Sequence, residues 1–135
     1  MVIDHIGIIV KNIKSSRKKY EDLLGYEIIS EIILDSFQKV KVQFLRNSNG
    51  QKIELIEPLG VDSPSFNALK KGAGVNHICY QCENLEYTLK ILRASHCIVV
   101  CKPIIGAGHE GRKIAFVVHP EMGLIEFVEN KKKDL

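Results

Sequence analysis

DHIGIIV, residues 4–10, is the first part of a pattern that the chain repeats. KIELIEP (52–58) follows it, and the second copy consists of NHICYQC (76–82) followed by GLIEFVE (123–129). Each copy starts with a strand-like apolar run that contains a histidine and ends with one that contains a glutamate. A pattern that recurs at a fixed distance indicates a duplicated supersecondary unit. We therefore expect two equivalent modules related by a pseudo-twofold axis.

The two copies keep their histidine and glutamate at the same spacing. His5 precedes Glu54 by 49 positions, and His77 precedes Glu126 by the same 49. Both residue types recur after 72 positions (77 − 5 and 126 − 54). A single strand histidine is most often a hydrogen-bonded core residue, and a single strand glutamate most often faces solvent. Here each one interrupts an apolar strand in both copies, and a buried carboxylate needs a partner.

These four side chains are therefore candidates for a metal site. Pseudo-twofold symmetry can bring two histidines and two carboxylates together at its axis. Two neutral imidazoles and two carboxylates form a suitable ligand set for divalent Co, Mn, Ni, Zn or Fe. The sequence predicts that His5, Glu54, His77 and Glu126 bind one divalent metal ion, whose identity the ligand set leaves open.

Apolar periodicity predicts a strand, a helix and then three strands in each half of the chain. In the first half we expect a strand at 4–10, a helix from about Lys14 to Leu24 that Gly25 ends, and strands at 26–34, 40–45 and 52–58. In the second half we expect a strand at 76–82, a helix capped by Asn84, and strands at 97–101, 113–118 and 123–129. The predicted fold class is α+β, built from two tandem βαβββ modules.

The chain is expected to form a single domain over residues 1–130. Module 1 covers 1–59, a linker covers 60–74, and module 2 covers 75–130. Ser63 and Pro64 offer an N-cap and a first-turn proline for a short linker helix that ends near Lys71. Residues 131–135 begin with three lysines and are expected to be a solvated basic tail.

Composition excludes several classes of function. The chain has 135 residues, a net charge of +3 and 45% hydrophobic residues, which is typical of a globular domain. Its basic residues form no stripe interleaved with aromatics, so we expect no nucleic-acid partner. Its apolar runs fall short of the roughly 18–20 residues that span a bilayer, so we expect no membrane association. The N-terminus lacks the features of a secretion signal, and we expect a cytoplasmic protein.

Four cysteines have the spacing C-x2-C-x14-C-x3-C, which resembles a structural zinc pattern. The first pair, Cys79 and Cys82, lacks the glycine turn that a zinc knuckle usually carries. Cys97 and Cys101 flank an apolar run, and their even spacing places them on one face of a strand. We expect reduced, mostly buried thiols, with a structural zinc site or a disulfide as the alternatives.

The remaining histidines and the glycine-rich loop carry weaker signals. We expect His96 on the surface and His119 in a turn, whereas His109 lies in the loop at 102–112 and could contact a ligand. GAGHEG, within this loop, lacks the spacing and the strand-to-helix context of a dinucleotide or phosphate-binding loop. It is either a flap whose backbone approaches the substrate or simply a long hairpin loop.

The duplicated strand–helix–three-strand order with His, Glu, His and Glu resembles the vicinal oxygen chelate superfamily, which includes glyoxalase I, extradiol dioxygenases and bleomycin-resistance proteins. Within it, the chain is most similar to the methylmalonyl-CoA epimerase family. The residues that carry this similarity are IDHIGIIV (3–10), KIELIEPLGVDSP (52–64), LKKGAGVNHI (69–78), IGAGHEG (105–111) and AFVVHP (115–120). The resemblance covers the chain to about Glu129 and implies a curved sheet that bears a cleft, the glyoxalase/bleomycin resistance/dioxygenase fold.

The resemblance also implies a function. We expect a metal-dependent epimerase of a methylmalonyl-CoA-type acyl thioester that works through a metal-stabilised enolate. Glu126 is then the first candidate for the catalytic base and Glu54 the second, both also metal ligands. The expected partner is a small-molecule substrate, an acyl-CoA or another thiol adduct, and family members often form homodimers. The substrate-binding residues are not identified by the sequence.

Two alternatives stay open. A glyoxalase I-like lactoylglutathione lyase, a carbon–sulfur lyase, would use the same four metal ligands. A non-catalytic binder of the bleomycin-resistance type is a different class, although such binders usually lack the metal ligands. Some epimerases carry a further acid on the third strand of the first module, where this chain offers only Val42 and Gln43.

Overall fold

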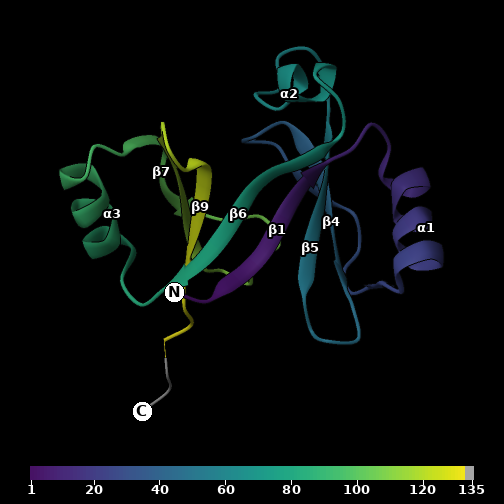
Figure 1. Ribbon diagram of the computed structural model, residues 1–135, viewed down its shortest axis with the longest axis horizontal. Coiled ribbons are helices and arrows are strands. Elements are labelled where there is room, and N and C mark those ends of the chain that lie inside the picture. The colour runs from purple at the N-terminus through teal and green to yellow at the C-terminus, as the bar shows by residue number, and fades with distance from the viewer. Residues whose placement is uncertain (133–135) are drawn as a thin grey trace. The chain divides into compact units, whose positions relative to one another are not determined.

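The computed structural model describes residues 1–132 (Figure 1), so most of the predicted basic tail lies outside the described residues. The described chain consists of two compact units. The N-terminal unit is His5–Asn76, and the C-terminal unit combines Met1–Asp4 with the chain from His77 onward. Each unit contains one copy of the repeated pattern.

The N-terminal unit is a small sheet covered on one face by a helix. Its elements are β1 (Ile3–Ile9, within the unit from His5), α1 (Ile13–Leu24), β2 (Glu27–Ile28), β3 (Ile33–Asp35), β4 (Val40–Arg46), β5 (Lys52–Pro58) and the short α2 (Phe66–Lys70). The strand order is β2-β4-β5-β1, and β3 also pairs with β4. β1 is parallel to β5, whereas β4 is antiparallel to its neighbours. α1 packs against β4 and β5 (Figure 1).

The C-terminal unit repeats this arrangement. Its elements are β6 (Gly74–Cys82, within the unit from His77), α3 (Leu85–Ala94), β7 (Ile98–Ile105), β8 (Lys113–His119) and β9 (Gly123–Glu129). The strand order is β6-β9-β8-β7. β6 is parallel to β9, and β8 is antiparallel to both β9 and β7. The predicted α+β class with two βαβββ modules is confirmed.

Both sheets bury apolar side chains on each face, because neighbouring strand residues point to opposite sides. On the helix face, each unit has one cluster formed by the sheet and its helix: Ile8, Val10, Leu45, Ile53 and Leu55 with Ile13 of α1, and Ala115, Val117, Ile125 and Phe127 with Leu85 and Leu89 of α3. On the opposite face, each has a second: Ile9, Val40, Val42, Phe44 and Ile56 in one unit, and Cys79, Ile114, Phe116 and Val128 in the other. Glu54 and Glu126, which lie in the middle of such strands, are therefore buried.

Both long helices begin at an asparagine cap. Asn12 Oδ1 accepts a hydrogen bond of 3.0 Å from the Ser15 amide, and Asn84 Oδ1 accepts one of 2.9 Å from the Tyr87 amide. Both asparagines have extended backbone angles, as the capping position requires. The predicted cap at Asn84 is confirmed, as is the predicted end of α1 at Gly25, whose φ of 71° is left-handed.

A glutamate at the end of each parallel strand also binds the helix start. Glu57 Oε1 accepts a hydrogen bond of 2.8 Å from the Ile13 amide, and Glu129 Oε2 accepts one of 2.9 Å from the Leu85 amide. These residues again differ by 72 positions (85 − 13 and 129 − 57). The carboxylate satisfies an amide that has no partner within the helix and lies at the positive end of its dipole. This contact was not among the features expected from the sequence.

The first module departs from prediction at the strand expected over residues 26–34. The structure divides it into β2 and β3, both paired with β4. Ser30 lies between them, and its Oγ accepts a hydrogen bond of 2.9 Å from the Phe44 amide. A serine side chain can replace a ladder partner in this way, and the backbone ladder is interrupted there.

The second module departs at the strand expected over 97–101, which extends to Ile105 as β7. Pro103 is tolerated inside it because β7 pairs only with β8 and forms an edge. Register shifts flank Cys101 and place it in the cluster opposite the helix, whereas Cys97 lies in the helix-side cluster. The prediction that these two cysteines share a face is therefore wrong, because a bulge changes which side a residue faces.

The predicted linker helix is present but begins later than expected. α2 spans Phe66–Lys70, and Lys71 is its C-terminal cap, as predicted. Its N-cap is Ser65 rather than Ser63. Ser63 is buried, and its hydroxyl contacts the Gln38 carbonyl and the Ser65 hydroxyl instead. The hydroxyl is thus engaged in a tertiary contact and does not cap the helix.

Candidate functional site

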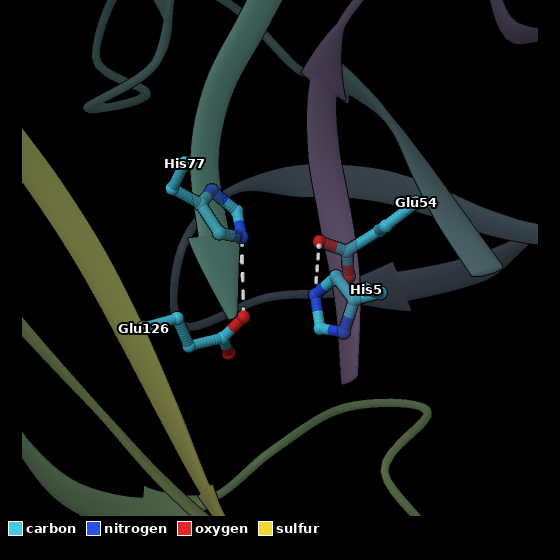
Figure 2. A group of neighbouring side chains, drawn as sticks. All are labelled: His5, Glu54, His77 and Glu126. Atoms are coloured by element: carbon cyan, nitrogen blue, oxygen red, sulfur yellow. Dashed lines mark hydrogen bonds and ion pairs between the residues drawn. The ribbon is translucent and has the colours of Figure 1, made fainter. Parts of the chain in front are cut away.

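In the N-terminal unit, the predicted ligands His5 and Glu54 form a buried pair (Figure 2). Strand β1 carries His5 and the parallel strand β5 carries Glu54, with Gly7 as the direct partner of Glu54. Both side chains lie on the sheet face opposite α1, since they alternate with residues of the helix-side cluster. His5 Nε2 is 3.6 Å from Glu54 Oε1. The ring of Phe44, whose backbone pairs with Glu54, meets the imidazole edge-on at 5.7 Å.

The C-terminal unit contains an equivalent pair on β6 and β9 (Figure 2). His77 Nε2 is 3.1 Å from Glu126 Oε1, and Cys79 takes the place that Gly7 has beside Glu54. Phe116 pairs with Glu126 across the sheet and meets the His77 ring edge-on at 5.1 Å. The duplication thus extends beyond histidine and glutamate to the aromatic residue that packs on the imidazole.

Each pair has the chemistry of half a metal site. The four residues are at most 6% exposed, and a carboxylate buried to this degree requires a compensating charge or hydrogen bonds. An imidazole nitrogen directed at a carboxylate oxygen offers one nitrogen and one oxygen ligand, which divalent transition metals accept. The structure brings together the predicted residues as His5 with Glu54 and His77 with Glu126.

A third imidazole, His109, contacts Glu126 in the C-terminal unit. Its Nε2 lies 3.6 Å from Glu126 Oε2, and the residue is 2% exposed. The two oxygens of Glu126 thus face two different histidines, Oε1 facing His77 and Oε2 facing His109. From the sequence, His109 was expected only as a residue of the glycine-rich loop that could contact a ligand.

Gly106 makes the inward position of His109 possible. A Cβ atom on Gly106 would lie 2.5 Å from His109 Cδ2 and 2.8 Å from Ile114 Cγ2, closer than any real contact. Only glycine allows this approach. Gly106, the first glycine of GAGHEG, was therefore the signal in the sequence that His109 is packed inward.

The same loop is attached to the N-terminal residues of the chain through Arg112. Its Nε donates a hydrogen bond of 3.1 Å to the His109 carbonyl, and its Nη2 lies 3.5 Å from Asp4 Oδ1. Gln81 Nε2 donates a bond of 3.2 Å to the same Asp4 oxygen. Arg112 and Asp4 are both mostly buried. The charge of Arg112 fixes the loop.

Gln43 is buried but lies on the other face of its sheet. It shares the helix side with Leu45, and Arg17 Nη1 on α1 donates a hydrogen bond of 3.1 Å to its Oε1. Its Nε2 donates one of 3.0 Å to the Ser30 carbonyl. Gln43 therefore supports α1 and the strand break, whereas its neighbour Val42 lies on the face of Glu54.

The four cysteines do not form the structural zinc site that the sequence offered as an alternative. All four thiols are reduced, and none belongs to a group of three or more potential metal ligands among residues 1–132. Cys82 and Cys97 lie in the helix-side cluster, and Cys79 and Cys101 lie on the opposite face. Burial raises the pKa of the Cys82 thiol, the carboxylate of Glu129 raises it further, and a hydrogen bond with Thr88 opposes both effects. The cysteines therefore serve mainly as apolar packing residues.

The fold and site define a protein of two βαβββ modules, each with a buried His–Glu pair that could hold a metal ion, and comparison with known proteins gives the family. The chain belongs to the glyoxalase/bleomycin resistance protein/dioxygenase superfamily, whose family model matches residues 4–116. The predicted resemblance is therefore confirmed.

Individual relatives refine this placement. The chain is 40% identical to the uncharacterized protein YqjC of Bacillus subtilis (strain 168), over 96% of this chain and 92% of that one. It is 31% identical to an ethylmalonyl-CoA/methylmalonyl-CoA epimerase of Cereibacter sphaeroides, over 88% of each. A solved structure of Streptomyces coelicolor methylmalonyl-CoA epimerase in complex with 2-nitronate-propionyl-CoA matches with a TM-score of 0.82 at 27% identity, over 96% of this chain and 97% of that one. None of the helices described is long and apolar enough to cross a membrane.

Proposed function

We propose that this protein is a metal-dependent epimerase that acts on an acyl thioester of the methylmalonyl-CoA type. The observation that carries the proposal is the duplicated buried pair of an imidazole and a carboxylate, which lie on equivalent strands in the two modules. The epimerase relatives support the choice of substrate class, because their names specify methylmalonyl-CoA and ethylmalonyl-CoA. The identity to these relatives is about 30%, so the substrate is part of the proposal.

The proposal makes His5, Glu54, His77 and Glu126 the ligands of one divalent ion. Two imidazoles and two carboxylates suit Co, Mn, Ni, Zn or Fe(II). A bound ion of this kind supplies a Lewis acid for the thioester oxygen, which makes the neighbouring C–H group easier to deprotonate. The buried, apolar surroundings of each pair, with Phe44 and Phe116 packed on the imidazoles, exclude water and strengthen electrostatic interactions.

Two carboxylates are available to move the proton. Epimerisation removes a proton from one face of the carbon and returns one to the other, so it requires a base on each side. Glu126 is the first candidate, because its two oxygens face separate partners. One oxygen could accept a proton while the other served as the metal ligand. Glu54, which occupies the equivalent strand position, is the second.

The first experiment is hydrogen–deuterium exchange at C2 of methylmalonyl-CoA in D2O, followed by mass spectrometry. We expect metal-reconstituted protein to catalyse exchange and metal-free protein not to. Absence of exchange in protein with bound metal would exclude this substrate class. A glyoxalase-type hemithioacetal would then be the next substrate to assay, since it requires the same kind of ligand set.

Two further expectations belong to this proposal. We place the enzyme in the cytoplasm and expect it to be a homodimer. Size-exclusion chromatography with light scattering measures the second point directly.

A further inference from the structure

We propose that His109 is a positioning residue that orients the carboxylate of Glu126. The inference rests on the proposed function, because it concerns the residue to which that function assigns metal binding and proton transfer. His109 Nε2 lies 3.6 Å from Oε2 of Glu126, whereas Oε1 faces His77 at 3.1 Å. A carboxylate with an imidazole beside each oxygen has less freedom to rotate than one with a single neighbour. His109 thereby keeps Oε1 beside His77, where the two side chains would hold a metal ion, and leaves Oε2 as the oxygen that would accept a proton.

The loop around His109 is built to keep the imidazole at this place. Gly106 leaves room for the ring, as a Cβ there would overlap it. Arg112 binds the His109 carbonyl and pairs with Asp4, so the end of the loop is fixed by a mostly buried ion pair. Gly108, Glu110 and Gly111 have left-handed backbone angles, with φ of 75°, 58° and 79°. A non-glycine residue in this region is held there by its surroundings, a feature that is frequent near functional sites.

The two modules differ at this position, which gives the two glutamates different roles. The residue 72 positions before His109 is Phe37, and it is 68% exposed. The first copy thus has the imidazole–carboxylate pair and the packed phenylalanine, but no histidine at the position that corresponds to His109. Because only Glu126 has this additional imidazole beside it, Glu126 is favoured over Glu54 as the first base.

The test separates orientation of the carboxylate from simple filling of space. Glutamine places its amide nitrogen near the position of histidine Nε2, whereas asparagine reaches only as far as Nδ1, and leucine fills the space without a polar atom. His109→Gln, His109→Asn and His109→Leu are therefore compared with wild type. His96→Asn is the control, because His96 is an exposed residue of the same unit with a φ of 69° that asparagine tolerates.

The main measurement is titration of metal-free protein with Co²⁺, followed by the visible absorption of the bound ion. Loss of a residue that orients a metal ligand typically weakens metal affinity or activity by about 10- to 100-fold. We expect a loss of this size in the leucine and asparagine variants, with an altered cobalt spectrum. The glutamine variant should retain most of the affinity, and the His96 control should match wild type. In enzyme that shows activity, kcat should fall most in the leucine and asparagine variants and least in the glutamine variant, while KM changes little.

Two results would overturn the proposal. One is Co²⁺ affinity and spectra in all three His109 variants that equal those of wild type. The other is a loss in the glutamine variant as large as that in the leucine variant, since a purely structural histidine tolerates neither. Circular dichroism checks that the variants are folded. If the leucine variant does not fold, the comparison of the glutamine and asparagine variants still tests the proposal. Because the cobalt titration needs no substrate, failure of the methylmalonyl-CoA assay leaves this test intact.

Discussion

At the scale of single residues, the two copies use glutamate in two positions with two roles. Glu54 and Glu126 each face an imidazole inside a sheet, while Glu57 and Glu129, three positions further on, bind the first amide of a helix. A shift of one position moves a strand residue to the other face. Glu54 and Glu57 therefore lie on opposite faces of the same strand, and so do Glu126 and Glu129.

The first prediction concerns the base. Glu126→Gln keeps the shape of the side chain but cannot accept a proton, and proton transfer by a positioned group contributes about 10²- to 10⁴-fold. We expect the exchange rate at C2 of methylmalonyl-CoA to fall by at least that factor while the fold survives. Glu121→Gln, in the exposed turn before β9, is the control. Near-wild-type exchange in the Glu126 variant would contradict the assignment.

The second prediction concerns Cys82, whose pKa is raised by burial. The thiolate is the reactive form, so a raised pKa leaves less of it at any pH below that value. We expect iodoacetamide at about pH 8 to modify Cys82 much more slowly than the partly exposed Cys101 in folded protein, as measured by peptide mass spectrometry. In urea the two rates should become similar. Rapid modification of Cys82 in the folded state would show that its surroundings are open to solvent.

The residues that could be found from the sequence are those that the duplication repeats. The spacing of His5, Glu54, His77 and Glu126 needs no structure, because each is marked by its copy. His109 has no such copy, and its burial depends on the space left by Gly106 and on the contact of Arg112 with Asp4. Gly106 precedes His109 by only three positions and is a local signal, whereas the contact of Arg112 with Asp4 joins residues far apart in the chain, and no local pattern predicts it.

At the scale of elements, the helices show how much local chemistry specifies and what tertiary structure adds. A capping asparagine and a terminal glycine mark the ends of α1 from the sequence alone. The carboxylate of Glu57 reaches the same helix start from β5, 44 positions away. The strand break at Ser30 follows from a hydrogen bond, and the bulge near Cys101 follows from a register shift. The apolar pattern of the sequence predicts neither feature.

The third prediction tests this contact between strand and helix. Glu57→Ala removes a charged acceptor from the Ile13 amide and the favourable interaction with the helix dipole. Hydrogen bonds to charged groups contribute about 1.5–3 kcal/mol, and partial exposure places this one at about 1–2 kcal/mol. We expect the free energy of unfolding, measured by urea denaturation, to fall by about that amount.

Glu31→Ala provides the control for this measurement, because Glu31 lies in an exposed loop of the same unit. We expect its effect to be within about 0.5 kcal/mol of zero. Equal stability of the two variants would mean that the amide of Ile13 is satisfied equally well by water. Glu129→Ala, which removes the equivalent contact in the C-terminal unit, should behave like Glu57→Ala.

At the scale of the whole molecule, the described chain has apolar clusters in both units and on both faces of each sheet. Stability should therefore come from burial, in contrast to small metal-dependent folds in which the ion replaces a core. The proposed metal then has a catalytic role, and the fold should not require it.

The last prediction follows from this difference. Protein treated with a chelator should keep its circular dichroism spectrum and unfold cooperatively, yet catalyse no exchange at C2 of methylmalonyl-CoA. Added Co²⁺ or Mn²⁺ should restore exchange and raise the melting temperature with concentration, because binding to the folded state at about 100 times Kd adds roughly 2.7 kcal/mol of stability. His77→Ala lacks one ligand and should show little of either effect. Exchange that survives complete removal of metal would contradict a Lewis-acid role, whereas unfolding on chelation would show that the ion also holds the fold together.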